Sequence, residues 1–141
     1  FSGIEKNFKD KSISNFNIYK LYPKVRLILK ILKTHKIKTG LVTSKDCFRT
    51  KKVLKKFSLK FDEVRCSDGK LNSKPKPDKI LSIIRKLKIK KKNTIYVGDM
   101  LVDKLTAQNA GVDYIHASYG YSKKIKHVNL IKSFDEIIKF L

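Results

Sequence analysis

Two carboxylates stand four residues apart directly after an apolar run in residues 95–103, IYVGDMLVD. If the apolar run is a strand and a helix follows it, Asp103 lies one helical turn beyond Asp99 and on the same face. Carboxylate oxygens are among the hard ligands that Mg²⁺ requires. The pattern therefore predicts that Asp99 binds Mg²⁺ and that Asp103 orients Asp99 or a water bound to the metal.

Two other predicted strand ends carry groups that bind phosphate. Thr43 and Ser44 end the short apolar run of residues 40–44, GLVTS, and Lys74 opens the segment 74–78, KPKPD, after another predicted strand. Mg²⁺ binds only some of the oxygens of a phosphate group, and hydroxyl and ammonium groups donate hydrogen bonds to the others. We therefore predict catalytic roles for Thr43 and Lys74, and phosphate binding by Thr43, Ser44 and Lys74.

The elements that must position these residues alternate along the chain. Short apolar segments indicate strands, and amphipathic segments between them indicate helices. This alternation favours an α/β fold with a Rossmann-like, doubly wound parallel sheet, in which ligands bind beyond the carboxyl ends of the strands. Ser133 and Glu136 also have the spacing of a capping box that opens a last helix. The strands are expected at residues 40–44, 61–66, 94–98 and 112–117, and the helices at about 23–32, 46–57, 77–88, 100–110 and after 133.

Each candidate residue also has a purely structural interpretation. Thr43 or Ser44 would cap the following helix. Asp99 would complement the dipole of its helix, and Asp103 would be a solvated partner of Lys104. The joint order along the chain favours the functional interpretation, because a hydroxyl, a Lys-Pro pair and a Gly-Asp pair each follow their own predicted strand.

The 141 residues are the size of one domain, with 34 Lys+Arg against 12 Asp+Glu and a formal net charge of +22. Such an excess raises the possibility of a nucleic-acid partner. However, lysines supply nearly all of it, whereas recognition of bases and phosphates by paired hydrogen bonds favours arginine. A genomic codon bias toward Lys, Ile and Asn would give this composition without a specific nucleic-acid partner, and we favour this interpretation. The arginines are Arg26, Arg49, Arg65 and Arg85.

The cysteines and histidines lack the spacing of a shared metal site. Cys47 and Cys66 are interpreted as small buried apolar residues, and His35, His116 and His127 as surface or packing residues. The sequence has no apolar run of about 18 residues and no signal-peptide pattern, so a cytoplasmic protein without a membrane partner is the default expectation. Nothing in the sequence indicates an oligomeric state.

Three motifs together resemble those of the haloacid dehalogenase-like hydrolase superfamily, most of all its phosphoglycolate phosphatase and β-phosphoglucomutase branch. They are LVTSK at 41–45, KPKPD at 74–78 and VGDMLVD at 97–103, followed by Ala107, Ala110-Gly111 and YGY at 119–121. The resemblance covers about residues 22–121. It implies a Mg²⁺-dependent phosphoric monoester hydrolase that acts on a small phosphorylated metabolite.

The resemblance also implies a role for each motif residue. Thr43 would hydrogen-bond the transferring phosphoryl group, and Lys74 would neutralise the phosphate and the nucleophile. Asp99 would bind Mg²⁺, and Asp103 would support the metal shell. A phosphosugar mutase of the same superfamily is the alternative within this resemblance.

One motif of the family has no counterpart in this sequence. The family's nucleophile is the first acid of an Asp-x-Asp motif at the end of the central strand, where it forms an aspartyl-phosphate. No two aspartates here are separated by a single residue; they are Asp10, Asp46, Asp62, Asp68, Asp78, Asp99, Asp103, Asp113 and Asp135. We therefore expect an N-terminally truncated chain, with residues 1–20 as a remnant of the helical cap or a linker and residues 21–141 as the core domain.

If the chain is truncated in this way, two further properties are expected. The strands that end at Thr43 and Gly98 should each have an unpaired edge where the central strand would lie. The chain alone should also be inactive, because the nucleophile would lie upstream.

Three other hypotheses about the class of protein remain open. A receiver-like signalling domain combines the same groups, but its acids come first along the chain and its lysine last. A basic nucleic-acid-binding module predicts binding that weakens steeply with salt. A non-catalytic scaffold with a phosphatase-like fold would keep the motifs without turnover.

Overall fold

The computed structural model describes residues 19–141, and it confirms the alternation of strands and helices. The predicted boundary between residues 20 and 21 stays a prediction, because residues 1–18 lie outside the described residues. In chain order the elements are α2 (Val25–Thr34), β1 (Gly40–Asp46), α3 (Cys47–Lys56), β2 (Glu63–Ser67), α4 (Asp78–Leu87), the 3₁₀ helix η2 (Lys91–Asn93), β3 (Ile95–Gly98), α5 (Leu101–Ala110), β4 (Asp113–Ala117), β5 (Asn129–Ile131) and the 3₁₀ helix η3 (Phe134–Phe140).

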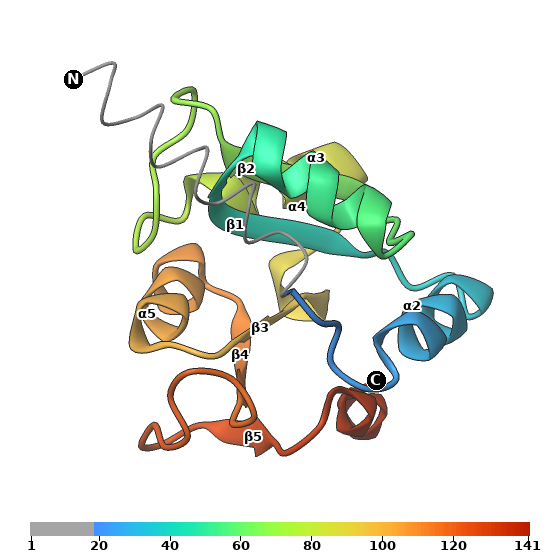
Figure 1. Cartoon of the computed structure of the whole chain (residues 1–141). Helices are drawn as coiled ribbons and strands as arrows, with labels where there is room; N and C mark the ends of the chain where they lie inside the picture. The colour runs from blue at the N-terminus through green and yellow to red at the C-terminus, as the bar shows by residue number, and fades with distance from the viewer. Residues whose placement is uncertain (1–18) are drawn as a thin grey trace.

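The strands form two parallel sheets (Figure 1). One sheet pairs β1 with β2, and the other has the order β3-β4-β5. Within residues 19–141, β1 and β3 each have one edge without a strand partner. This matches the expectation of unpaired edges on the strands that end at Thr43 and Gly98.

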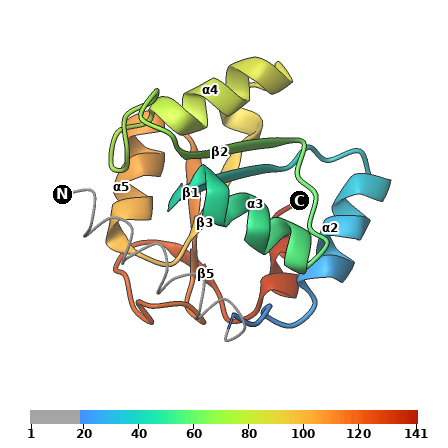
Figure 2. The same cartoon turned by 45° about the horizontal axis from the view of Figure 1, so that its top comes forward.

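Helices cover the sheets from both sides, as a parallel sheet requires. Both α3 and α4 pack on β1 and β2, with α4 above and α3 below the strand pair in Figure 2. Helix α5 packs on β3 and β4. No helix in residues 19–141 combines the length and apolar character needed to cross a bilayer.

The largest apolar core joins α2 to the C-terminal half of the chain. Ile28 and Leu32, four residues apart on one face of α2, pack with Ile115 of β4, Ile131 of β5 and Ile137 of η3. These five side chains are buried. The core therefore fixes the β3-β4-β5 sheet, whose carboxyl end carries Gly98 and Asp99.

The end of the chain differs from the expectation. The predicted capping box at Ser133 is wrong, because the Ser133 side chain makes no cap hydrogen bond and the last helix is a 3₁₀ helix. The Glu136 carboxylate instead accepts a hydrogen bond from the Lys132 N–H at 2.7 Å. The three-residue strand β5 was not predicted, since three residues are too few to show the alternation of apolar and polar side chains that indicates a strand.

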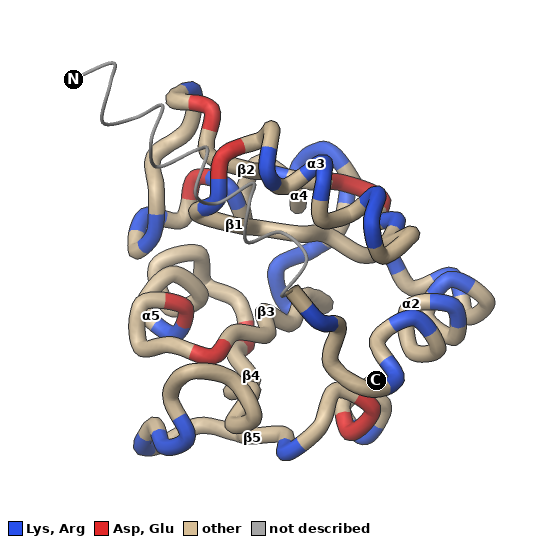
Figure 3. The backbone as a smooth tube through the Cα atoms, viewed as in Figure 1, with Lys and Arg blue, Asp and Glu red and all other residues tan. Residues whose placement is uncertain are grey.

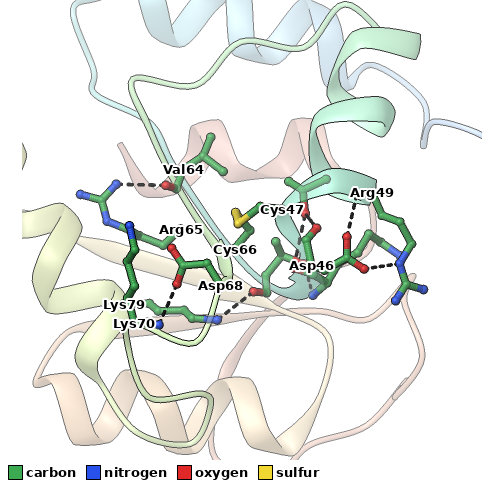
Figure 4. The surroundings of a disulfide bond; sticks show 12 residues. Asp46, Cys47, Arg49, Val64, Arg65, Cys66, Asp68, Lys70 and Lys79 are labelled. Atoms are coloured by element: carbon green, nitrogen blue, oxygen red, sulfur yellow. Dashed lines mark hydrogen bonds and ion pairs between the residues drawn. A yellow bond between two sulfur atoms is a disulfide. The ribbon is translucent and has the colours of Figure 1, made fainter. Parts of the chain in front are cut away.

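Cys47 and Cys66 form a disulfide, so their interpretation as buried apolar residues is wrong. The cause is the parallel register of β1 and β2, which pairs Asp46 with Ser67. Cys47 follows Asp46 and Cys66 precedes Ser67, and their Cα atoms lie 5.1 Å apart, within the range that a disulfide spans. The bond thus ties the start of α3 to the end of β2 (Figure 4).

The disulfide should stabilise the chain. It closes a loop between residues 19 apart, and a closed loop of this length stabilises the folded state by about 3 kcal/mol. We expect a reducing agent to lower the free energy of unfolding, measured by urea denaturation, by about this amount.

A Cys47→Ser, Cys66→Ser double variant is the control. It should unfold at the lower urea concentration with and without the reducing agent. Equal unfolding curves for the oxidised wild type and the double variant would contradict a stabilising disulfide.

Candidate active site

Asp103 organises the turn between β3 and α5. It is buried, with 4% of its side chain exposed, and its Oδ1 lies 2.6 Å from the Lys74 Nζ, whose side chain is 16% exposed. Its Oδ2 accepts hydrogen bonds from the N–H groups of Asp99 and Met100, both at 3.1 Å. The interpretation of Asp103 as a solvated partner of Lys104 is therefore wrong, and Lys104 instead donates to the carbonyl of Lys126.

Tyr96 adds a further donor to the same carboxylate. Its hydroxyl donates to Asp103 Oδ1 at 3.4 Å. Burial, followed by the negative charge of Asp103, raises the pKa of Tyr96 far above its usual value, so the phenol keeps its proton. Both oxygens of Asp103 are thus occupied by donors from this chain. Asp103 holds Lys74 and the turn in place.

Gly98 is required by the close approach of Asp103. A Cβ atom at Gly98 would lie 2.3 Å from the Asp103 Cβ and 2.7 Å from its Oδ2. The backbone of Gly98 does not have a positive φ, so a sharp turn is not the reason for glycine here. The absence of a side chain lets the buried carboxylate reach the N–H groups of the turn.

The loop after β4 holds Asp99 from the other side. The N–H of Tyr121 donates to Asp99 Oδ2 at 3.0 Å, and the N–H of Ser122 donates to the Asp99 carbonyl at 3.1 Å. A Cβ atom at Gly120 would lie 2.4 Å from Asp99 Oδ2. The half-buried Asp99 carboxylate is therefore fixed through one oxygen, and its Oδ1 has no hydrogen bond to the described residues.

His116 belongs to a hydrogen-bond network that contacts the turn between β3 and α5. It is fully buried; its Nε2 contacts the Ser122 carbonyl, and its Nδ1 lies 3.0 Å from the Tyr114 hydroxyl. That hydroxyl also lies 3.0 Å from the carbonyl oxygen of Gly98. The interpretation of His116 as a surface or packing residue missed this network. The alternation within β4 was the available signal, because it places Tyr114 and His116 on one face of the strand.

Thr43 lies in an irregular stretch of β1, between the paired residues Val42 and Asp46. Its hydroxyl accepts a hydrogen bond from the N–H of Lys45 at 3.1 Å. The cap of α3 is Asp46, whose Oδ1 accepts from the Arg49 N–H at 2.8 Å. The alternative that Thr43 or Ser44 caps this helix is therefore wrong.

The structure joins some of the candidate residues directly and others only through neighbours. Lys74, Asp103 and Asp99 form one hydrogen-bonded cluster. Thr43 is linked to α4 through its carbonyl, which accepts a hydrogen bond from Lys79 at 3.2 Å. Within residues 19–141, no hydrogen bond joins the Thr43 side chain to Lys74 or to Asp99. Their convergence on one phosphate stays a prediction, as does the role of the exposed Ser44.

The donor set for a metal is small. In the part of the chain that the structure describes, no three His, Cys, Asp or Glu side chains gather as a metal site. Mg²⁺ commonly uses one or two carboxylates and takes its other oxygens from water and substrate phosphate. A single carboxylate such as Asp99, with one oxygen fixed and the other without a partner in residues 19–141, fits that requirement.

The site and the fold agree with the comparisons with known proteins. The model of the family described as haloacid dehalogenase-like hydrolase matches residues 4–117. The chain therefore belongs to this family of hydrolases, as its motifs indicated.

Its relatives include phosphoglycolate phosphatases. The one from Psychrobacter arcticus is 34% identical over 119 residues, which are 82% of this chain and 52% of that protein. The one from Mannheimia succiniciproducens is 30% identical over 108 residues, 75% of this chain and 48% of that protein. The resemblance to the phosphoglycolate phosphatase branch is thus confirmed, and the chain spans about half the length of these relatives.

Solved structures confirm the Rossmann-like α/β fold. A haloacid dehalogenase superfamily hydrolase of subfamily IA from Geobacter sulfurreducens is 27% identical, with a TM-score of 0.76 over 85% of this chain and 55% of that chain. A protein from Lactobacillus plantarum at 21% identity has a TM-score of 0.88 over 99% of this chain and 70% of its own.

Asp103 should be the most sensitive position of the site for stability. Asp103→Asn leaves the part-buried Lys74 ammonium without its carboxylate, and the loss of one partner of such an ion pair destabilises a protein by about 3 kcal/mol. The free energy of unfolding by urea measures this loss. Asp113→Asn is the matched control at an exposed position of β4, with an expected change below about 0.5 kcal/mol.

A double-mutant cycle with Lys74→Met isolates the ion pair itself. Asp103→Asn should be less destabilising when Lys74 is already replaced. Additive losses would show that the two side chains do not interact.

Proposed function

We propose that this chain is the phosphate- and metal-binding part of a Mg²⁺-dependent phosphoric monoester hydrolase that acts on a small phosphorylated metabolite. The observation that carries the proposal is the cluster in which buried Asp103 holds the Lys74 ammonium and the N–H of Asp99. Its phosphoglycolate phosphatase relatives support a small phosphate ester as substrate.

In this proposal each residue has one role toward the phosphate. Lys74 neutralises the negative charge of the phosphoryl group, and Asp103 keeps the lysine extended toward the strand ends. Thr43 and Ser44 donate their hydroxyl hydrogens to phosphate oxygens. Asp99 is the carboxylate ligand of Mg²⁺, which would polarise a phosphoryl oxygen and offset the charge that develops there.

The proposal places the nucleophile in residues outside this sequence. A carboxylate there attacks phosphorus, the bond to the leaving oxygen breaks, and a second acid protonates that oxygen. Water then hydrolyses the aspartyl-phosphate and releases phosphate. Two observations support this: no Asp-x-Asp occurs in the sequence, and β1 and β3 both have an edge free of a strand partner within residues 19–141.

Charge alone does not favour nucleic-acid binding as a second function. Lysines and arginines lie on several elements, including α2, α3 and the loop before β5 (Figure 3). A phosphosugar mutase shares the same site chemistry and is separated from a hydrolase by its product.

Activity should depend on an added nucleophile. We expect the 141 residues alone to show no Mg²⁺-dependent hydrolysis of p-nitrophenyl phosphate, because an attacking carboxylate is missing. Extension at the N-terminus with a strand that ends in Asp-x-Asp should produce hydrolysis, measured by released p-nitrophenolate. The same extension with Asn in place of the first Asp is the control and should remain inactive. Equal activity of the unextended chain would refute the placement of the nucleophile.

Metal binding should depend on the loop that fixes Asp99. In Gly120→Ala the new Cβ atom must displace the Asp99 carboxylate, so we expect Mg²⁺ to bind at least about tenfold more weakly by isothermal titration calorimetry.

Gly69→Ala is the control for this experiment. Gly69 has a φ of 80°, a conformation that is strained for other residues, but a Cβ atom there meets nothing within 4 Å. It should lower stability by about 1 kcal/mol and leave Mg²⁺ affinity unchanged. Unchanged affinity in Gly120→Ala would remove Asp99 as the metal ligand.

A further inference from the structure

Lys79 is a buried ammonium group that the proposed roles leave unused. It lies in the first turn of α4, and only 2% of the residue is exposed. Lysine is rarely buried to this extent unless a carboxylate pairs with it. Within residues 19–141, no carboxylate lies within ion-pair distance of Lys79. Its burial therefore needs another explanation.

The Lys79 ammonium points to the phosphate-binding end of β1. Its Nζ donates to the Thr43 carbonyl oxygen at 3.2 Å, shown as the dashed line from Lys79 in Figure 4. An ammonium group has three hydrogens to donate, and this is its one hydrogen bond to the described residues. Lys79 thus adds a positive charge directly beside the turn that carries Thr43 and Ser44.

The surroundings of Lys79 compensate this charge only in part. Burial lowers the pKa of Lys79, the charge of Asp68 raises it, and the charge of Lys74 lowers it. Asp68 is exposed and accepts a hydrogen bond from the Lys70 N–H. Lys74 already has Asp103 as its partner, whereas Lys79 has none. A buried charge without a direct ion-pair partner is unfavourable, so an anion bound near the end of β1 would relieve it.

We propose that Lys79 is a second cationic residue of the phosphate site, which attracts the phosphoryl group to the Thr43 turn while Lys74 approaches it from the side of Asp103. The inference rests on the proposed phosphate site and adds a residue to it. Two ammonium groups that act on one anion favour a doubly charged phosphate group over a singly charged anion.

Binding of inorganic phosphate to the 141-residue chain tests this role. Lys79→Gln removes the charge and keeps an N–H donor for the Thr43 carbonyl, and we expect it to raise the Kd for phosphate about tenfold by isothermal titration calorimetry. Lys86→Gln is the matched control, because it removes the same charge from an exposed position of the same helix. Its Kd should stay within about twofold of the wild type.

Lys79→Arg tests whether phosphate binding depends on the charge of residue 79 or on the shape of its side chain. It keeps the positive charge, and its Kd should lie closer to that of the wild type than to that of Lys79→Gln. Equal Kd values for Lys79→Gln and Lys86→Gln would overturn the inference. So would a folded Lys79→Arg that binds phosphate as weakly as Lys79→Gln, because only the shape of the lysine would then matter.

Far-UV circular dichroism shows whether the variants fold. If a variant does not fold, NMR of the wild type with ¹⁵N-labelled lysine provides the test. The ¹⁵Nζ resonance of Lys79 should shift as phosphate is added, and the shift should saturate. If phosphate binds without this shift, the role of Lys79 is overturned and the proposed function is not. A wild-type chain that binds no phosphate overturns the proposed function together with it.

Discussion

An ion pair between the part-buried Lys74 and the buried Asp103 joins two segments that lie 29 residues apart in the chain. Lys74 belongs to the loop before α4, and Asp103 to the first turn of α5. Because Asp103 also accepts two backbone N–H groups, one side chain sets both the direction of the lysine and the shape of the β3–α5 turn. A carboxylate so buried needs donors at both oxygens, because a buried oxygen without a hydrogen bond is costly.

The glycines of the site follow from the same constraint. Gly98 and Gly120 are each the position where a carboxylate packs against the backbone, Asp103 at the first and Asp99 at the second. Tyr114 and His116 then connect the two backbone segments from behind. The turn with Asp99 is thus held by three parts of the chain: α5, the loop after β4, and β4 itself.

The sequence predicted the elements with a clear period and failed where long-range geometry decides. The apolar spacing of Ile28 and Leu32 indicates α2 without knowledge of the fold, and the run before Gly98 indicates β3. By contrast, the disulfide depends on the register between β1 and β2, which no local pattern contains. His116 was misread because its partners, Tyr114 and Ser122, meet it only once the loop after β4 folds back. Likewise, Lys79 is one of many lysines in the sequence and becomes distinct only through its burial.

The edges of β1 and β3 that have no strand partner within residues 19–141 affect how the described domain behaves in isolation. Each edge presents a row of N–H and C=O groups that another extended chain can complete, including the same edge of a second molecule. Pairing between copies would therefore compete with any segment that pairs with these edges. A segment that covers either edge would therefore also lower the tendency of the domain to associate with itself as its concentration rises.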